Sequence, residues 1–138
     1  MRRYTQDNSY FERINSERKA YWLGFLYADG CVYENKAGGK SVILSLHQKD
    51  KYILEEFLKD LKSDRKVDID SRGYAGIRIG SIKIANDLIK LGCIPRKSLV
   101  LKFPTEDILP RNLVSHFIRG YMDGDGCIST KFKNIKVE

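Results

Sequence analysis

One short sequence occurs twice in this chain of 138 residues. Residues 24–32 read Gly-Phe-Leu-Tyr-Ala-Asp-Gly-Cys-Val, and residues 120–128 read Gly-Tyr-Met-Asp-Gly-Asp-Gly-Cys-Ile. Each copy ends an apolar run with Asp-Gly, which predicts two similar helices that stop at a glycine. Two self-similar buried helices can pack against each other and bring one carboxylate from each copy to a shared place. The repeat therefore predicts a helix pair with Asp29 and Asp125 at one end.

Small residues stand four apart in each predicted helix, so that they share one face. The pairs are Gly24 with Ala28 and Gly120 with Gly124. Small residues at this spacing let two helix backbones approach closely. For the glycines taken alone, a helix contact without any chemistry is the alternative interpretation.

The two aspartates favour a metal site over a plain contact. A carboxylate at a helix C-terminus is disfavoured by the helix dipole and by the unpaired carbonyl groups. Two carboxylates on adjacent helix ends repel each other unless cations neutralise them, and carboxylate and carbonyl oxygens are ligands for Mg²⁺ or Ca²⁺. A metal ion held there can activate a water and stabilise an in-line displacement at phosphorus.

Composition points to a polyanionic partner. Lys and Arg number 25 against 18 Asp and Glu, for a net charge of +7, which favours nucleic acid first and an acidic membrane surface second. Hydrophobic residues make up 42% of the chain, enough for one globular core. The odd count of three cysteines favours a reducing compartment. No apolar run approaches the ~20 residues of a membrane span and no signal peptide is evident, so we expect an intracellular protein without a membrane partner.

The pattern of the remaining residues predicts an α+β fold of one repeat and a fraction. The first motif helix is expected near 16–29, and a helix over 51–61 separates two hairpins with strands near 31–36, 41–47, 66–70 and 74–79. A short helix capped by Ser81 follows, and the second motif helix begins near Arg111. Residues 1–110 form the first repeat, and 111–138 hold the second motif helix and the start of a repeat too short to complete. This leaves open a homodimer, or a domain-swapped dimer through the motif helices.

The face of the predicted sheet away from the helices is polar and aromatic. If the aliphatic strand residues face the helices, the other face carries Tyr33, Asn35, Ser41, Ser45, His47, Arg72, Tyr74 and Arg78. A β-ribbon fits the major groove of DNA, where such side chains can read base edges. An ordinary solvated sheet face is the alternative.

The two repeated segments, residues 22–30 and 118–126, resemble the two copies of the LAGLIDADG motif of homing endonucleases. The helix-strand-strand-helix-strand-strand order after the first copy is similar to that fold, an αββαββα repeat with a four-stranded antiparallel sheet. The resemblance implies that the motif helices form the central interface, that the sheet lies in the major groove of double-stranded DNA, and that Asp29 and Asp125 bind divalent metal. Mg²⁺ is the expected cofactor, with Ca²⁺ or Mn²⁺ able to substitute, and the backbone carbonyls of Ala28 and Gly124 are further candidate ligands.

Softer similarities add candidate catalytic residues. Gln48 and Lys49 resemble the Gln-Lys segment that flanks the family's site, and residues 95–99, with Lys97, resemble its basic loop. A lysine at either place can stabilise phosphate charge, and a plain solvated charge is the alternative. The sequence departs from the family at the sixth motif position, where Tyr27 replaces an acid, and in the absence of a second sheet.

These features together predict a site-specific, divalent-metal-dependent double-strand DNA endonuclease of the kind that mobilises introns or inteins. The missing sheet predicts weak or no cleavage by this chain alone. A nucleic-acid-binding protein that does not cut, such as a regulator or an RNA maturase on the same fold, is the alternative from another class. A metal-binding scaffold unconnected with nucleic acid is the third.

Overall fold

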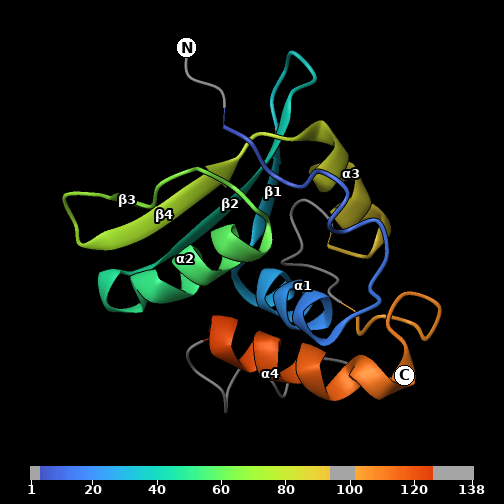
Figure 1. Cartoon of the computed structure of the whole chain (residues 1–138). Helices are drawn as coiled ribbons and strands as arrows, with labels where there is room; N and C mark the ends of the chain where they lie inside the picture. Colours follow the sequence, from blue (N-terminus) through green and yellow to red (C-terminus); the bar gives the residue numbers. More distant parts are fainter. Residues whose placement is uncertain (1–3, 94–101, 126–138) are drawn as a thin grey trace.

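The computed structural model describes residues 4–93 and 102–125. It is an α+β fold in which one antiparallel sheet is covered on one side by helices, as the sequence predicts (Figure 1). The elements in chain order are α1 (Glu17–Asp29), β1 (Cys31–Glu34), β2 (Lys40–His47), the 3₁₀ turn η1 (Gln48–Asp50), α2 (Lys51–Asp60), β3 (Asp68–Ile69), β4 (Tyr74–Ile79), α3 (Ile82–Lys90), the 3₁₀ turn η2 (Arg111–Leu113) and α4 (Val114–Asp125).

Helix α1 is the centre of the hydrophobic core. It begins after Ser16, whose hydroxyl accepts a hydrogen bond from the Lys19 amide at 3.2 Å, and it ends where the Gly30 amide donates to the Leu26 carbonyl. Trp22, the only tryptophan, is completely buried within it. Because α1 packs against both the sheet and α4, nearly its whole middle is apolar instead of one stripe.

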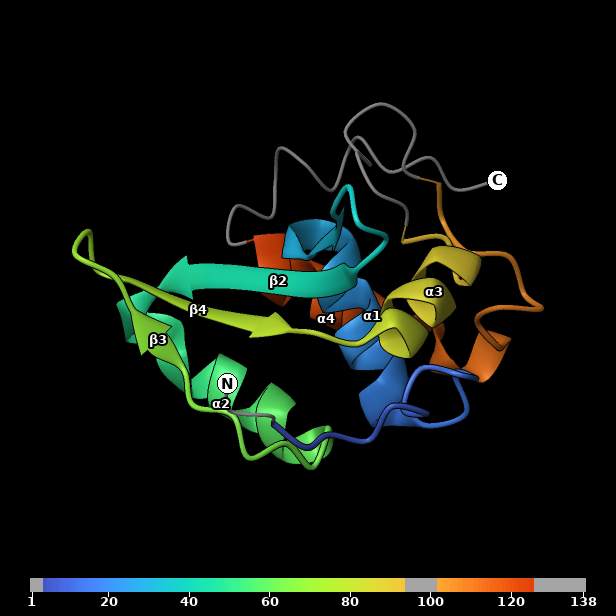
Figure 2. The same ribbon diagram turned by 90° about the horizontal axis from the view of Figure 1, so that it is seen from above.

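The four strands pair in the order β1-β2-β4-β3, and every pair is antiparallel. Val42 pairs with Ile79 and Leu44 with Ile77, so these side chains share the face that packs on the helices, where all four are buried. Figure 2 views the molecule from the sheet side, with β2 and β4 crossing in front of α1. Figure 1 shows α4 beyond α1, on the side away from the sheet.

Two strands are shorter than the sequence pattern predicts. Strand β1 ends at Glu34 because the Asn35 side chain accepts hydrogen bonds from the amides of Ala37 and Gly39, which forms a turn in place of further strand. Strand β3 is reduced to Asp68–Ile69 because Asp70 in turn accepts from the amides of Arg72 and Tyr74. The alternating sequence pattern extends beyond the residues at which these side-chain hydrogen bonds turn the backbone out of the strand. The predicted strands are therefore too long.

The segment before α1 is part of the core, although its sequence reads as polar. Tyr10, Phe11 and Ile14 are buried, and the Asp7 amide donates to the Leu61 carbonyl after α2 at 2.6 Å. Polar and charged residues surround these three apolar residues in the sequence, so the sequence pattern gives no structural prediction for them.

None of the helices in the described part of the chain has the length and apolar character needed to cross a bilayer.

Candidate metal centre and nucleic-acid interface

Helices α1 and α4 contact each other through their glycines, backbone against backbone. A Cβ atom on Gly24 would lie 2.0 Å from the Phe117 carbonyl oxygen, and one on Gly120 would lie 1.9 Å from the Tyr21 carbonyl oxygen. No real Cβ atom approaches an oxygen so closely, and only glycine permits this separation. Since residues 21, 24, 117 and 120 occupy corresponding places in the two motifs, each helix meets the other in the same way.

The same contacts fix the direction of the pair. A Cβ on Gly124 would lie 2.8 Å from the Phe25 carbonyl oxygen and 3.1 Å from the Ala28 Cβ, one turn beyond the contact of Gly120 with Tyr21. Residue numbers therefore rise together along both helices, which makes the pair parallel. The last residues of the two helices, Asp29 and Asp125, consequently lie at the same end of the pair.

The carboxylates at this end are withdrawn from solvent. Oδ2 of Asp29 and both carboxylate oxygens of Asp125 are inaccessible to water. Burial, followed by the negative charge of Asp125, raises the pKa of Tyr121. Concentrated buried negative charge at two helix C-termini is an arrangement that a cation stabilises.

The donor set is suited to a hard divalent ion. Among the described residues, no third His, Cys, Asp or Glu joins a group that could hold a metal, so the protein offers carboxylates from two helices and the carbonyl groups at their ends. Mg²⁺ commonly binds through one or two carboxylates, keeps several waters and takes substrate phosphates as further ligands. Asp29 and Asp125 therefore fit such an ion.

Three further contacts join α1 and α4, and the sequence pattern does not predict them. The Tyr21 hydroxyl donates to Oδ2 of Asp123 at 2.6 Å, and the Arg119 guanidinium lies 4.9 Å from the centre of the Tyr21 ring. On the other side of the pair, the Tyr27 ring meets the Phe117 ring edge to face at 5.0 Å. The only available signal was the difference between the two motif copies at their sixth position.

Tyr27, which departs from the motif, is a buried structural residue here. It is 3% exposed and its hydroxyl donates to the Leu91 carbonyl at 2.5 Å. Burial raises its pKa. The position therefore ties α1 to the end of α3 as well as to α4.

Gln48 and Lys49 lie in η1, directly after β2. Both are exposed, and the Gln48 amide donates to the Gly73 carbonyl in the β3–β4 turn at 2.9 Å. They thus lie where strand β2 meets the neighbouring hairpin turn. Lys97 lies outside the described residues.

Most of the predicted nucleic-acid-facing residues do share the open face of the sheet. Tyr33 pairs with Ser41, and His47 with Tyr74, so these side chains project from one face together with Ser45. The Arg78 guanidinium lies 5.3 Å from the centre of the Tyr33 ring, and the Arg72 guanidinium lies at the same distance from the Tyr74 ring. Two arginine–tyrosine pairs are thereby held at separate places on the face.

Two of the predicted residues are placed differently. Ser41 is only 4% exposed, so its hydroxyl does not reach the surface, and Asn35 uses its side-chain oxygen within the β1–β2 turn. Strand alternation gives the face of a side chain but neither its depth nor its local hydrogen bonds, which is why the burial of Ser41 and the turn at Asn35 are not predicted.

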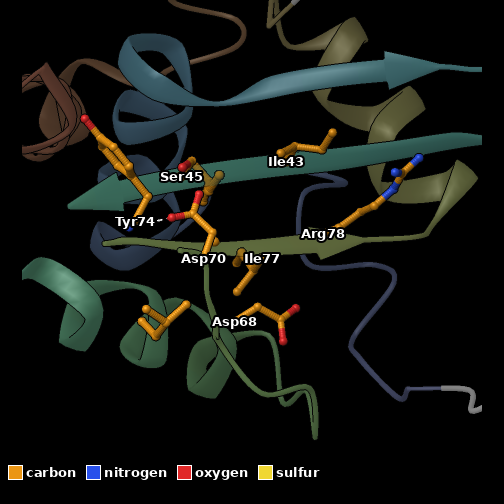
Figure 3. A pocket seen from close by; sticks show the side chains of 10 residues that line it. Ile43, Ser45, Asp68, Asp70, Tyr74, Ile77 and Arg78 are labelled. Carbon is orange, nitrogen blue, oxygen red and sulfur yellow. Dashed lines mark hydrogen bonds between the residues drawn. The ribbon is translucent and has the colours of Figure 1, made fainter. Parts of the chain in front are cut away.

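A shallow groove runs across this face between β2, β4 and β3 (Figure 3). Its labelled lining includes Ile43, Ser45, Asp68, Tyr74 and Arg78. Asp70 borders it and pairs with Arg72 at 3.0 Å, and hydrogen bonds from the Tyr74 amide and from Arg72 lower the pKa of Asp70. The groove therefore offers donors, acceptors and apolar surface side by side.

The His47 ring is held in one orientation at the edge of this face. Its Nδ1 accepts a hydrogen bond from the Lys49 amide at 3.2 Å, and its ring meets Tyr74 edge to face at 6.2 Å. Because Nδ1 is the acceptor, the neutral ring carries its proton on Nε2. The exposed ring can therefore offer a directed donor.

The solved structures that are similar to this chain include the following three. The I-LtrWI LAGLIDADG homing endonuclease bound to target DNA shares 21% identity over 60% of this chain, with a TM-score of 0.40, and the LAGLIDADG meganuclease I-AabMI bound to uncleaved DNA shares 28% over 56%, with a TM-score of 0.39. A variant of I-DmoI, solved with nicked target DNA in the presence of Mn, shares 14% over 87%, with a TM-score of 0.42. This chain spans 30%, 28% and 61% of those three chains, respectively.

No curated protein matches this chain. A family model does match, that of the LAGLIDADG-like domain, over residues 16–86, just over half of the sequence. The matched residues run from the cap of α1 through the sheet into α3. The chain therefore belongs to the LAGLIDADG-like domain family.

Proposed function

We propose that this chain is part of a site-specific, divalent-metal-dependent endonuclease that cuts double-stranded DNA, of the kind that mobilises introns or inteins. The observation that carries the proposal is the parallel packing of α1 on α4, which gathers Asp29 and Asp125, with buried oxygens, at one end of the pair. Family membership and the open sheet face support it.

The sheet face supplies the means to hold and read a duplex. Arg72 and Arg78 are positive, planar donors steadied by tyrosine rings, and a guanidinium so held can bind guanine in the major groove or a phosphate. Exposed His47 and Tyr74 lie beside each other at one end of β2 and β4. The net charge of +7 favours the approach of the polyanion.

Asp29 and Asp125 would hold Mg²⁺ or Mn²⁺, with the carbonyl groups of Ala28 and Gly124 as additional candidate ligands. A bound divalent ion supplies Lewis acidity, which lowers the pKa of a water and neutralises charge on the phosphate. The protein's own contribution is to fix both carboxylates on helices that cannot separate without losing backbone contact. Gln48, Lys49 and Lys97 are proposed to act on the water or the phosphate.

The first experiment measures metal binding without DNA. Isothermal titration with Mn²⁺ compares the wild-type chain with Asp29→Asn and Asp125→Asn. We expect the heat of binding to be lost in both variants and retained in Glu55→Gln, which changes an exposed acid on α2. Mn²⁺ binding that persists in both aspartate variants would remove the metal assignment.

The second experiment measures cleavage. Duplexes selected for binding from a randomised pool are incubated with protein in Mg²⁺, in Ca²⁺ and in chelator. We expect Mg²⁺-dependent cutting at a long site, abolished by either aspartate variant while binding is retained. Tight metal-independent binding with no cutting of any selected duplex would instead favour the nucleic-acid-binding alternative.

A further inference from the structure

The contact between α1 and α4 is symmetric in its backbone but not in its side chains. On one side, Asp123 of α4 accepts the hydrogen bond of the Tyr21 hydroxyl on α1. On the other side, Tyr27 of α1 packs its ring on Phe117 of α4. In each contact, a residue in the first half of one helix (Tyr21 or Phe117) meets a residue in the second half of the other helix (Asp123 or Tyr27).

The repeat shows that these two contacts occupy corresponding places. When Gly24 is matched with Gly120, Tyr21 corresponds to Phe117 and Tyr27 corresponds to Asp123. The hydrogen bond and the ring contact are therefore two versions of one position pair. At the first of these positions α1 has a tyrosine, Tyr21, and α4 has Phe117. At the second, α1 has another tyrosine, Tyr27, and α4 has the carboxylate of Asp123.

Pairing of like helices would lose the hydrogen bond between Tyr21 and Asp123. Two α4 helices packed in the same way would set the Asp123 carboxylate against a Phe117 ring, which has no donor to offer. Two α1 helices would set the Tyr21 hydroxyl against Tyr27, whose own hydroxyl is held by the Leu91 carbonyl. Tyr21 is only 8% exposed, so its hydroxyl would lose a charged acceptor at a largely buried place, whereas the exposed Asp123 carboxylate would return to water. Like pairing therefore costs the hydrogen bond between Tyr21 and Asp123.

We propose that these four residues make α1 and α4 complementary to each other but not to themselves. A second copy of this chain then joins through the motif helices by exchange in preference to like pairing, with α1 of each copy on α4 of the other. Like-with-like pairing is disfavoured because it loses the hydrogen bond between Tyr21 and Asp123, although the glycine contacts would permit it. This rule is a property of the helix interface and holds whether or not the chain cuts DNA.

The test is the effect of Tyr21→Phe in two backgrounds. In the wild-type chain the substitution removes the donor to Asp123, and we expect the melting temperature to fall by about 3–5 °C. In Asp123→Tyr the same substitution recreates the Tyr27–Phe117 contact on the opposite side, and we expect the melting temperature to rise. The phenol hydroxyl introduced by Asp123→Tyr would extend into the groove lined by Tyr52 and Glu56, where Asp123 already lies exposed.

The sign of the change separates pairing chemistry from general packing. Tyr33→Phe, which trims the hydroxyl of a 45% exposed tyrosine on β1, is the matched control and should leave both backgrounds unchanged. An equal fall of melting temperature in the two backgrounds would overturn the proposal. If Asp123→Tyr does not fold alone, the double variant made directly decides: it is expected to fold, and its failure would refute complementarity.

Light scattering provides the second readout. The double variant Y21F/D123Y presents the same side-chain pair on both motif helices, so like-helix pairing no longer costs more than pairing of α1 with α4. We expect its average molar mass to rise with protein concentration more steeply than that of the wild-type chain. Identical concentration dependence of the two proteins would overturn the pairing rule.

Discussion

Gly120 offers the sharpest test of how α1 and α4 are held together. The substitution Gly120→Ala adds one methyl group whose carbon would start 1.9 Å from the Tyr21 carbonyl oxygen and 2.7 Å from its carbonyl carbon. Ordinary contact begins at 3.4 Å, so that the helix backbones must separate by roughly 1.5 Å at this point. No side-chain rotation can relieve the clash, because the opposing atoms belong to the backbone.

The expected cost combines two opposing effects. Overpacking of a well-packed core costs about 1–3 kcal/mol, and the upper end applies where backbone must move. Alanine in place of a helical glycine returns about 1 kcal/mol through its higher helix propensity. We therefore expect a net loss of about 2 kcal/mol in the free energy of unfolding, which lowers the melting temperature by about 6–10 °C.

The assay is thermal and urea unfolding followed by circular dichroism, with Gly80→Ala as the matched control. A Cβ on Gly80 meets nothing within 4 Å, and the Gly80 φ angle lies outside the left-handed region. This control is expected to be neutral or to stabilise by about 0.4–1 kcal/mol, because it restricts the unfolded chain. Equal stabilisation by both alanines would show that the helices do not touch at Gly120 and would refute the close parallel pair.

Three further results are expected. Asp60→Asn should cost about 1–2 kcal/mol of stability and shift the tryptophan emission. The reason is that the Asp60 carboxylate accepts a hydrogen bond from the Trp22 indole at 2.6 Å and pairs with Arg18 at 2.7 Å. An unchanged emission spectrum and urea midpoint would contradict a stabilising role of Asp60. Burial raises the pKa of Tyr10 and Tyr27, so the stability that their neutral forms contribute is complete below about pH 10 and is lost as the pH rises further. Tyrosine ionisation, followed by absorbance at 295 nm, and unfolding, followed by circular dichroism, should therefore occur together. Ionisation of these tyrosines without loss of structure would contradict their burial. Arg78→Ala should weaken binding to a selected duplex by about 5- to 150-fold in gel-shift titrations, with Lys90→Ala on α3 as the control; equal affinity for the two variants would remove Arg78 from the DNA interface.

Regular elements were predictable wherever local chemistry and periodicity agree. Ser81 caps α3, as predicted, since its hydroxyl accepts from the Ile84 amide, and Gly92 follows the helix at a φ of 98°. Strand β4 matches its predicted range of 74–79 because buried and exposed residues alternate along it without interruption. The predicted strand ends were wrong where a side chain, in place of the neighbouring strand, accepts hydrogen bonds from backbone amides, as Asn35 and Asp70 do after β1 and β3.

In the candidate site, too, the features set by local sequence were predictable, and the features set by contacts between distant segments were not. Positions of Asp29 and Asp125 at helix ends, and of the glycines on one helix face, follow from spacing alone. The burial of Ser41 and the hydrogen bond of Tyr21 with Asp123 depend on which segments meet, and residues 102 positions apart in sequence carry no local signal of their contact.

The sequence by itself determined that two similar helices, each closed by an aspartate, belong to one chain, because a repeated residue pattern dictates a repeated local structure. Only the tertiary structure decided that these helices run parallel with reciprocal glycine contacts, which is what places both carboxylates at one end. It alone also decided that the two helix faces are complementary instead of equivalent, since complementarity arises from pairs of side chains across the interface and not from either helix considered separately.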